Sequence, residues 1–156
     1  MTNEVNASPL SIAGVLITPL KRIATAGGDV LHGMKATDPG FAGFGEAYFS
    51  LVQPGAVKAW KRHRRMTLNL IVPAGSVRFV IFDDRAGSPT LGQFAQIVLS
   101  PERYGRLTVP PMLWMGFQGV SSDTAMLLNV ASIGHDPTEV DRQPADALSF
   151  KWSSDS

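Results

Sequence analysis

Apolar and polar residues alternate in short runs along most of the chain. The run at 46–53 (EAYFSLVQ) alternates loosely and ends at Pro54-Gly55, a dipeptide that favours a turn. Other short runs are rich in β-branched and aromatic residues, and such runs between turn clusters are typical of strands. We therefore predict strands at 46–53, 66–72, 77–82, 94–99, 106–109, 125–130 and 148–152.

Two of these runs are close together and predict a hairpin. The sequence MTLNLIV at 66–72 is followed by PAGS and then by VRFVIF at 77–82. Because VRFVIF is apolar on nearly every side, we expect this strand to lie between two sheets. Short strands separated by turns, without a sustained helical period, predict an all-β domain of two antiparallel sheets, either a sandwich or a jelly roll.

Composition agrees with this fold class and excludes several others. Of 156 residues, 44% are hydrophobic and 17% are charged, which is usual for a globular domain, and we predict one domain over 1–156. The 15 glycines and 11 prolines favour many short elements over a few long helices. The chain has no cysteine, which excludes disulfides, thiolate metal sites and a cysteine nucleophile.

The N-terminal segment gives no indication of export or membrane insertion. Glu4 stands where a secretory signal has positive charge. The apolar stretch at 12–17 is far shorter than the roughly 18 residues that a membrane helix needs. We expect a soluble, cytoplasmic protein that does not bind membranes.

Positive charge is concentrated in one segment. The formal net charge is only +1, yet 58–65 contains five basic residues, Lys58, Lys61, Arg62, Arg64 and Arg65. Such a cluster attracts anions. From the residues alone, three hypotheses stay open: a phosphate or diphosphate site, a nucleic-acid surface, and a solvated edge strand whose charges discourage aggregation. Of these, nucleic acid is the partner that we do not expect.

A series of motifs follows one another between 86 and 152. They are SPTLGQ at 88–93, Leu99-Ser100, the stretch 110–117, DPTE at 136–139 and ALSFKW at 147–152. In this order they resemble the dTDP-4-dehydrorhamnose 3,5-epimerase family of cupins, over about residues 46–152. The resemblance implies a cupin jelly roll (double-stranded β-helix) of two antiparallel sheets. It also implies a homodimer in which an N-terminal arm, 1–30, exchanges strands.

The resemblance further implies a substrate and a reaction. The substrate would be a dTDP-4-keto-6-deoxy sugar, from which a base removes a proton next to the ketone before a proton returns to the opposite face. We therefore expect a carbohydrate isomerase, of the epimerase type, that needs no cofactor. The alternative is a catalytically inactive cupin that only binds the sugar nucleotide.

The basic segment is similar to the family motif G-V-L-R-G-L-H-x-Q. In this comparison Lys58 replaces a phosphate-binding arginine, and Lys61 replaces the catalytic histidine. Asp83 matches an aspartate that supports the histidine, and Asn129 stands where a tyrosine donates a proton. An exposed lysine is protonated at neutral pH, so Lys61 is a base only if burial and neighbouring cations lower its pKa. The amide of Asn129 donates hydrogen bonds but delivers no proton.

His63 is a second candidate base. Residues two apart on a strand share a face, so Lys61 and His63 point the same way, which we expect to be into the barrel. The R-G-x-H-x-H-K pattern of the dTDP-sugar 3,4-ketoisomerases resembles this stretch and has a histidine at the position of His63. On this hypothesis His63 is the base, Lys61 polarises the ketone and Asp83 orients the base.

Other residues are expected to bind the substrate. Pairing with diphosphate oxygens is expected of three cations, Lys58, Arg62 and Arg64. Three aromatic residues are expected either to stack on a base or sugar of the ligand or to form part of the core. They are Tyr48, Trp60 and Trp114. One histidine beside a lysine is a poor ligand set for a transition metal, so we expect no bound metal.

Overall fold

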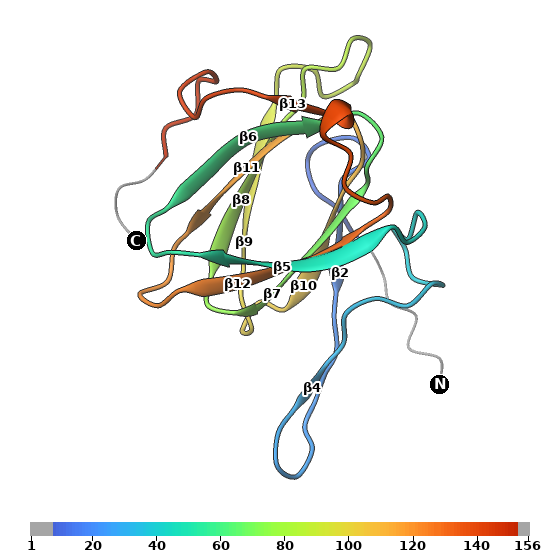
Figure 1. The fold of residues 1–156 in the computed structure, drawn as a ribbon, viewed down its shortest axis with the longest axis vertical. Helices are drawn as coiled ribbons and strands as arrows, with labels where there is room; N and C mark the ends of the chain where they lie inside the picture. The colour runs from blue at the N-terminus through green and yellow to red at the C-terminus, as the bar shows by residue number, and fades with distance from the viewer. Residues whose placement is uncertain (1–7, 153–156) are drawn as a thin grey trace.

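The computed structural model describes residues 8–152, which form two antiparallel sheets that face each other (Figure 1). The first sheet has the strand order β1-β2-β10-β7-β12-β5 and the second has the order β13-β6-β11-β8-β9. The predicted all-β jelly roll of two antiparallel sheets is therefore confirmed. Among the described residues, no helix is long and apolar enough to span a membrane.

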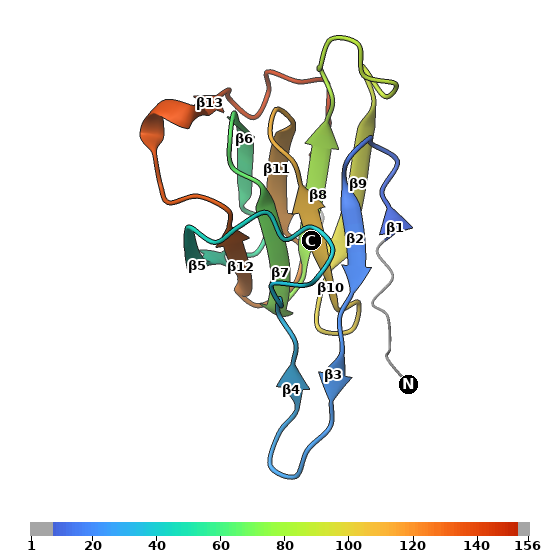
Figure 2. The same ribbon diagram turned by 90° about the vertical axis from the view of Figure 1, so that its right-hand side faces the viewer.

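The strands are short and their bounds are as follows. The first sheet contains β1 (Ser8–Pro9), β2 (Leu16–Pro19), β5 (Glu46–Val52), β7 (Leu68–Ala74), β10 (Gly105–Val109) and β12 (Ala125–Ala131). The second sheet contains β6 (Val57–His63), β8 (Val77–Phe82), β9 (Phe94–Leu99), β11 (Trp114–Gly119) and β13 (Val140–Arg142). A 3-10 helix, η1 (Pro137–Glu139), precedes β13, and β3 (Arg22–Ile23) pairs with β4 (Val30–Leu31) in a hairpin that projects from the sheets (Figure 2).

The predicted hairpin between 66–72 and 77–82 is wrong. β7 pairs with β10 and β12, whereas β8 pairs with β11 and β9 in the other sheet. The chain turns at Gly75, whose φ of +73° suits glycine, and passes from one sheet to the other. A turn between two apolar runs therefore marks a change of sheet here.

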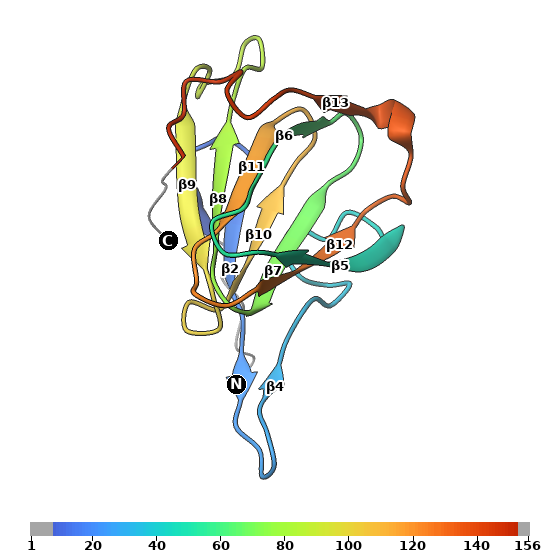
Figure 3. The ribbon, with the colours of Figure 1, turned by 60° about the vertical axis from the view of Figure 1, so that its left-hand side comes forward.

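The two faces of β8 are buried in different ways. Phe79 and Ile81 belong to the main core between the sheets, whereas Val80 belongs to a second apolar cluster. That outer cluster also contains Phe150 and Trp152 from the C-terminal segment, which runs from β13 toward β9 (Figure 3). β8 thus lies between a sheet and a covering segment, which explains its nearly continuous apolar sequence without placing it between two sheets.

The predicted strand at 148–152 is absent from the structure. These residues adopt no regular element, although Leu148, Phe150 and Trp152 all pack in the outer cluster. Their alternate spacing produces the strand-like pattern because one side of an irregular segment covers the sheet. Burial on one side, without backbone pairing, is enough to create this periodicity.

The N-terminal stretch at 12–17 packs against the sheets of its own chain. Ile12 and Val15 lie in the main core, and β2 pairs with β10. Residues 1–7 of the predicted arm lie outside the described residues. Exchange of strands with a second copy stays a prediction.

Candidate functional site

A cavity of about 530 Å³ opens between the two sheets. Its apolar wall includes Leu68, Leu70 and Leu127 from the first sheet and Met115 and Phe117 from the second. Its polar wall is formed by Glu46, Tyr48, Ser50 and Asn129 from the first sheet, Lys58, Lys61, His63 and Arg142 from the second, and His135 from the segment before η1. A cavity in which apolar side chains and convergent polar groups meet is typical of a small-molecule site.

Strand β6 supplies three of the polar groups. Lys61 and His63 share a face, as their spacing predicts, and both line the cavity. Lys58 is three residues from Lys61 and would point away on a regular strand. The register between β6 and β11 shifts between Met115 and Phe117, and this irregularity accompanies the turn of Lys58 onto the cavity side.

His63 is paired with a buried carboxylate. Its Nδ1 atom lies 2.5 Å from Oε1 of Glu139, a residue that is only 3% exposed. The other carboxylate oxygen accepts the backbone N–H groups of Arg65 at 3.1 Å and Met66 at 3.2 Å. Three donors therefore fix the Glu139 carboxylate, which in turn fixes the imidazole ring.

The charge state of Glu139 determines which ring nitrogen of His63 is available. Burial opposes ionisation, but the hydrogen bonds from His63 and from the backbone outweigh it and hold the pKa of Glu139 below its usual value. An ionised carboxylate only accepts hydrogen bonds, so Nδ1 of His63 is the donor. In the neutral imidazole this leaves Nε2 unprotonated, and the ring can act as a base.

Lys61 lies near two other cations. Partial burial lowers its pKa, and the nearby charges of Arg142 and Lys58 lower it further. Within residues 8–152 none of these three cations forms an ion pair with a carboxylate, although Lys58 donates to the carbonyl of Leu51 at 3.2 Å. The cavity therefore offers an anionic ligand three cations that are not engaged in ion pairs within this part of the chain.

Replacing Arg142 with glutamine should raise the pKa of Lys61, because one of the two nearby positive charges that disfavour its protonated form is removed. The pKa can be followed by NMR titration of protein with ¹³C-labelled lysine side chains. Arg64→Gln is the matched control, since Arg64 is paired with Asp141 outside the cavity. An unchanged Lys61 pKa in the Arg142 variant would contradict this electrostatic description.

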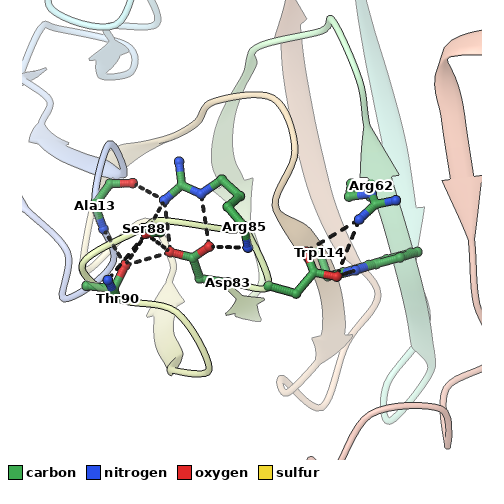
Figure 4. Close-up of polar contacts among 8 residues, drawn as sticks. Ala13, Arg62, Asp83, Arg85, Ser88, Thr90 and Trp114 are labelled. Atoms are coloured by element: carbon green, nitrogen blue, oxygen red, sulfur yellow. Dashed lines mark hydrogen bonds and ion pairs between the residues drawn. The ribbon is translucent and has the colours of Figure 1, made fainter.

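The structure does not bring Arg62 and Arg64 to the cavity. Asp141 lies 2.8 Å from the Arg62 guanidinium and 2.5 Å from that of Arg64. Arg62 also lies 3.3 Å from Asp84 and 4.7 Å above the Trp114 ring, whose Nε1 donates to Asp84 (Figure 4). The expectation that these arginines bind diphosphate is corrected, because acidic partners on the outer face of the sheet already neutralise both. The expectation that Trp114 stacks on the ligand is also corrected, because Arg62 lies over its ring and Trp114 does not line the cavity.

Trp60 also lies outside the cavity. It is 1% exposed in the outer cluster, where Phe150 and Trp152 pack against it, and its Nε1 donates to the carbonyl of Ala145 at 3.1 Å. The expectation that Trp60 stacks on a ligand is therefore wrong, because the C-terminal segment already occupies that face. The alternative that we gave for this residue, a place in the core, is the one that the structure shows.

Asp83 is buried at the end of β8, in a network of its own. Its carboxylate is fully buried and accepts hydrogen bonds from Arg85 at 2.9 Å and from the hydroxyls of Ser88 and Thr90 at 2.6 Å each (Figure 4). Arg85 and these hydroxyls hold the pKa of Asp83 far below its usual value. Arg85 also donates to the carbonyl of Ala13 at 2.7 Å, so the network ties this loop to the N-terminal segment.

The carboxylate beside His63 is therefore Glu139 and not Asp83. In the sequence, Glu139 is notable only as the last residue of the DPTE motif, because it lies 76 residues from His63 along the chain. The expectation that Asp83 orients the base is corrected: its oxygens are occupied within the loop that follows β8.

Tyr48 and Asn129 meet on the opposite wall of the cavity. They are direct partners in the pairing of β5 with β12, and Nδ2 of Asn129 donates to the Tyr48 hydroxyl at 3.1 Å. Oδ1 of Asn129 accepts the backbone N–H of Asn69 at 3.2 Å. The cavity thus has an imidazole–carboxylate pair and cations on one wall and a phenol on the other.

The known proteins that this chain resembles are sugar epimerases and isomerases. A family model described as dTDP-4-dehydrorhamnose 3,5-epimerase matches residues 58–155. The crystal structure of a dTDP sugar isomerase from Desulfovibrio desulfuricans G20 is 41% identical, with a TM-score of 0.91, and the alignment covers 94% of this chain and 95% of that one. NovW, a 4-keto-6-deoxy sugar epimerase from Streptomyces spheroides, has the same fold at 22% identity, with a TM-score of 0.84 over 97% of this chain and 81% of that one.

One curated relative matches over a shorter length. It is the probable low-salt glycan biosynthesis epimerase Agl13 of Haloferax volcanii, which is 29% identical over 98 residues. The match covers 62% of this chain and 63% of that protein, so it spans less than two thirds of the relative.

Proposed function

The chain belongs to the dTDP-4-dehydrorhamnose 3,5-epimerase family, and on this premise we propose that it epimerises a nucleotide-linked 4-keto-6-deoxy sugar, with His63 as the base. The observation that supports this most directly is the His63–Glu139 pair in the wall of a cationic cavity. A base of this kind is what removal of a proton next to a ketone requires.

The proposed reaction begins with proton transfer to His63. Nε2 accepts the proton, and the electron pair of the broken C–H bond moves toward the ketone oxygen to give an enolate. Glu139 stabilises the imidazolium that forms, because its carboxylate already accepts the Nδ1 proton. Lys61 lines the same wall and supplies positive charge to the developing enolate oxygen.

The remaining cations of the cavity suit the diphosphate of the substrate. Lys58 and Arg142 line the cavity without carboxylate partners among residues 8–152, and they are the groups that we assign to phosphate oxygens. Arg62 and Arg64 are left out of this assignment because Asp141 already pairs with both. The proposal needs no cofactor; a homodimer and a cytoplasmic location stay predictions.

Solvent exchange tests the proposal. The protein is incubated with dTDP-4-keto-6-deoxyglucose in deuterated water, and C3 and C5 of the sugar are followed by NMR. We expect deuterium at one or both carbons, together with the epimeric product. No deuterium above a protein-free blank at either carbon would contradict the proposed epimerase.

Ligand binding distinguishes the remaining alternative. A thermal shift that grows with dTDP concentration is expected in either case, because a ligand that binds only the folded state stabilises it. Stabilisation by dTDP without deuterium exchange would identify a cupin that binds the sugar nucleotide and does not transform it.

A further inference from the structure

We propose that Tyr48 donates the proton that completes the reaction, from the wall opposite His63, and that Asn129 positions its hydroxyl. This inference rests on the proposed function. Inversion at a carbon needs a donor on the face opposite the base. His63 is on β6 of the second sheet, whereas Tyr48 is on β5 of the first, and both line the same cavity.

The bonding of Asn129 determines the direction in which the Tyr48 hydroxyl donates. Because Oδ1 of Asn129 accepts the N–H of Asn69, its Nδ2 group faces Tyr48 and donates to the phenolic oxygen. The phenol is the acceptor in this bond, so its own proton is left to donate elsewhere. The cavity adjoins the Tyr48 side chain and is where a substrate would meet that proton.

A buried polar network holds the side chain of Asn129 through its Oδ1 atom. The side chain of Asn69 accepts a hydrogen bond from Thr108 at 2.6 Å and donates to the carbonyl of Gly40 at 3.0 Å. Thr108, Asn69 and Asn129 are all buried, and polar side chains in such a place are stable only when their hydrogen bonds are made. The network reaches the cavity at Asn129 and Tyr48.

The other groups on this wall are less suited to the role. Asn129 has an amide, which delivers no proton, and Ser50 has an aliphatic hydroxyl, which is a weaker acid than a phenol. Glu46 has a carboxyl group, which in its ionised form only accepts hydrogen bonds. Lys61 can deliver a proton, but it shares its strand and its face with His63. Among the polar groups that line the cavity, Tyr48 combines an acidic hydroxyl, the opposite wall and a fixed orientation.

The proton and electron balance of the step is complete. After His63 has removed the proton, the enolate electron pair forms a new C–H bond with the proton of Tyr48, and the ketone is restored. The Tyr48 phenolate that results keeps the hydrogen bond from Asn129, which stabilises its negative charge. The side chain of Tyr48 is 42% exposed, so water can carry the proton from His63 back to it.

Tyr48→Phe separates this role from that of the base. The variant keeps the ring and loses only the hydroxyl. With dTDP-4-keto-6-deoxyglucose in deuterated water, we expect formation of the epimer to fall by about 10²- to 10⁴-fold. Deuterium should still enter at the deprotonated carbon with retention of configuration, because His63 alone exchanges its proton with solvent. Phe49→Leu, on the same strand but outside the cavity lining, should change neither rate.

The outcomes of this test are distinct. Normal epimer formation by Tyr48→Phe, or loss of exchange and epimer together, would overturn the role of Tyr48. Absence of exchange in the unaltered protein would overturn the proposed function and the role of Tyr48 with it.

Asn129→Asp tests the positioning by a second route. A carboxylate at this place accepts the phenolic proton instead of donating to the oxygen, which turns that proton away from the cavity. We expect the same result as for Tyr48→Phe, with exchange retained and epimer lost. A purely structural role of Asn129 would lower both rates together, in proportion to the loss of folded protein, and would contradict the positioning role.

Discussion

Replacement of His63 with asparagine should remove deuterium exchange at the carbons beside the ketone, with a loss of about 10²- to 10⁴-fold, the usual contribution of a positioned base. The physical reason is that Nε2 of His63 is the acceptor that the Glu139 carboxylate leaves free. The rate is measured by NMR in deuterated water at saturating sugar nucleotide. Retained exchange in this variant would exclude His63 as the base.

Lys61→Met is the informative control for the His63 variant, because both residues line the same wall of the cavity. If His63 is the base, Lys61→Met slows exchange through weaker stabilisation of the enolate but does not abolish it. Loss of all exchange in Lys61→Met, with exchange retained in His63→Asn, would assign the base to Lys61, whose pKa is lowered by burial and by neighbouring cations. Circular dichroism should show that both variants are folded.

Replacement of Asp83 with alanine should lower the free energy of unfolding by about 3 kcal/mol, because a buried carboxylate with several donors is lost and those donors are left without their acceptor. The change is measured by urea denaturation. Exchange per folded molecule should stay at the level of the unaltered protein, since the Asp83 network does not line the cavity. A specific loss of exchange would restore the catalytic role that the sequence suggested.

The effect of Asp83 should also depend on pH. The pKa of Asp83 is lowered in the folded state, so its contribution to stability is complete above the pKa of the unfolded chain, about 3.9, and is lost as the pH falls toward the folded value. The stability difference between the two proteins should therefore be constant near neutral pH and should shrink below about pH 4. Asp84→Ala, a partly exposed neighbour, is the control and should cost about 1 kcal/mol.

Periodicity in the sequence predicted most of the strands but not their sheets. The alternation at 46–53 and the apolar run at 77–82 match β5 and β8 closely. The predicted hairpin was wrong, because a turn does not reveal which sheet the chain enters next. The predicted strand at 148–152 was wrong, because alternation of apolar residues indicates burial on one side and not backbone pairing. Both errors concern long-range packing, which local patterns do not contain.

The same limit applies to the site. The spacing of Lys61 and His63 correctly predicted a shared face, because neighbouring positions of one strand determine it. The charges of Arg62 and Arg64 suggested phosphate binding, because nothing near them in the sequence indicates Asp141, which lies 79 residues from Arg62. Glu139 was missed as the partner of His63 for the same reason.

The two arginines that pair with Asp141, Arg62 on β6 and Arg64 directly after it, have a consequence for how this site can vary. Asp141 is the neighbour in sequence of Arg142, and β13 joins both to Glu139. The ion pairs of Asp141 with Arg62 and Arg64 therefore hold β13, and with it Glu139, next to the imidazole of His63. Substitution at an inward position such as 58, which we assign to phosphate oxygens, can change ligand preference, while the outward arginines preserve the geometry of proton transfer. Specificity and catalysis can therefore evolve separately along one strand.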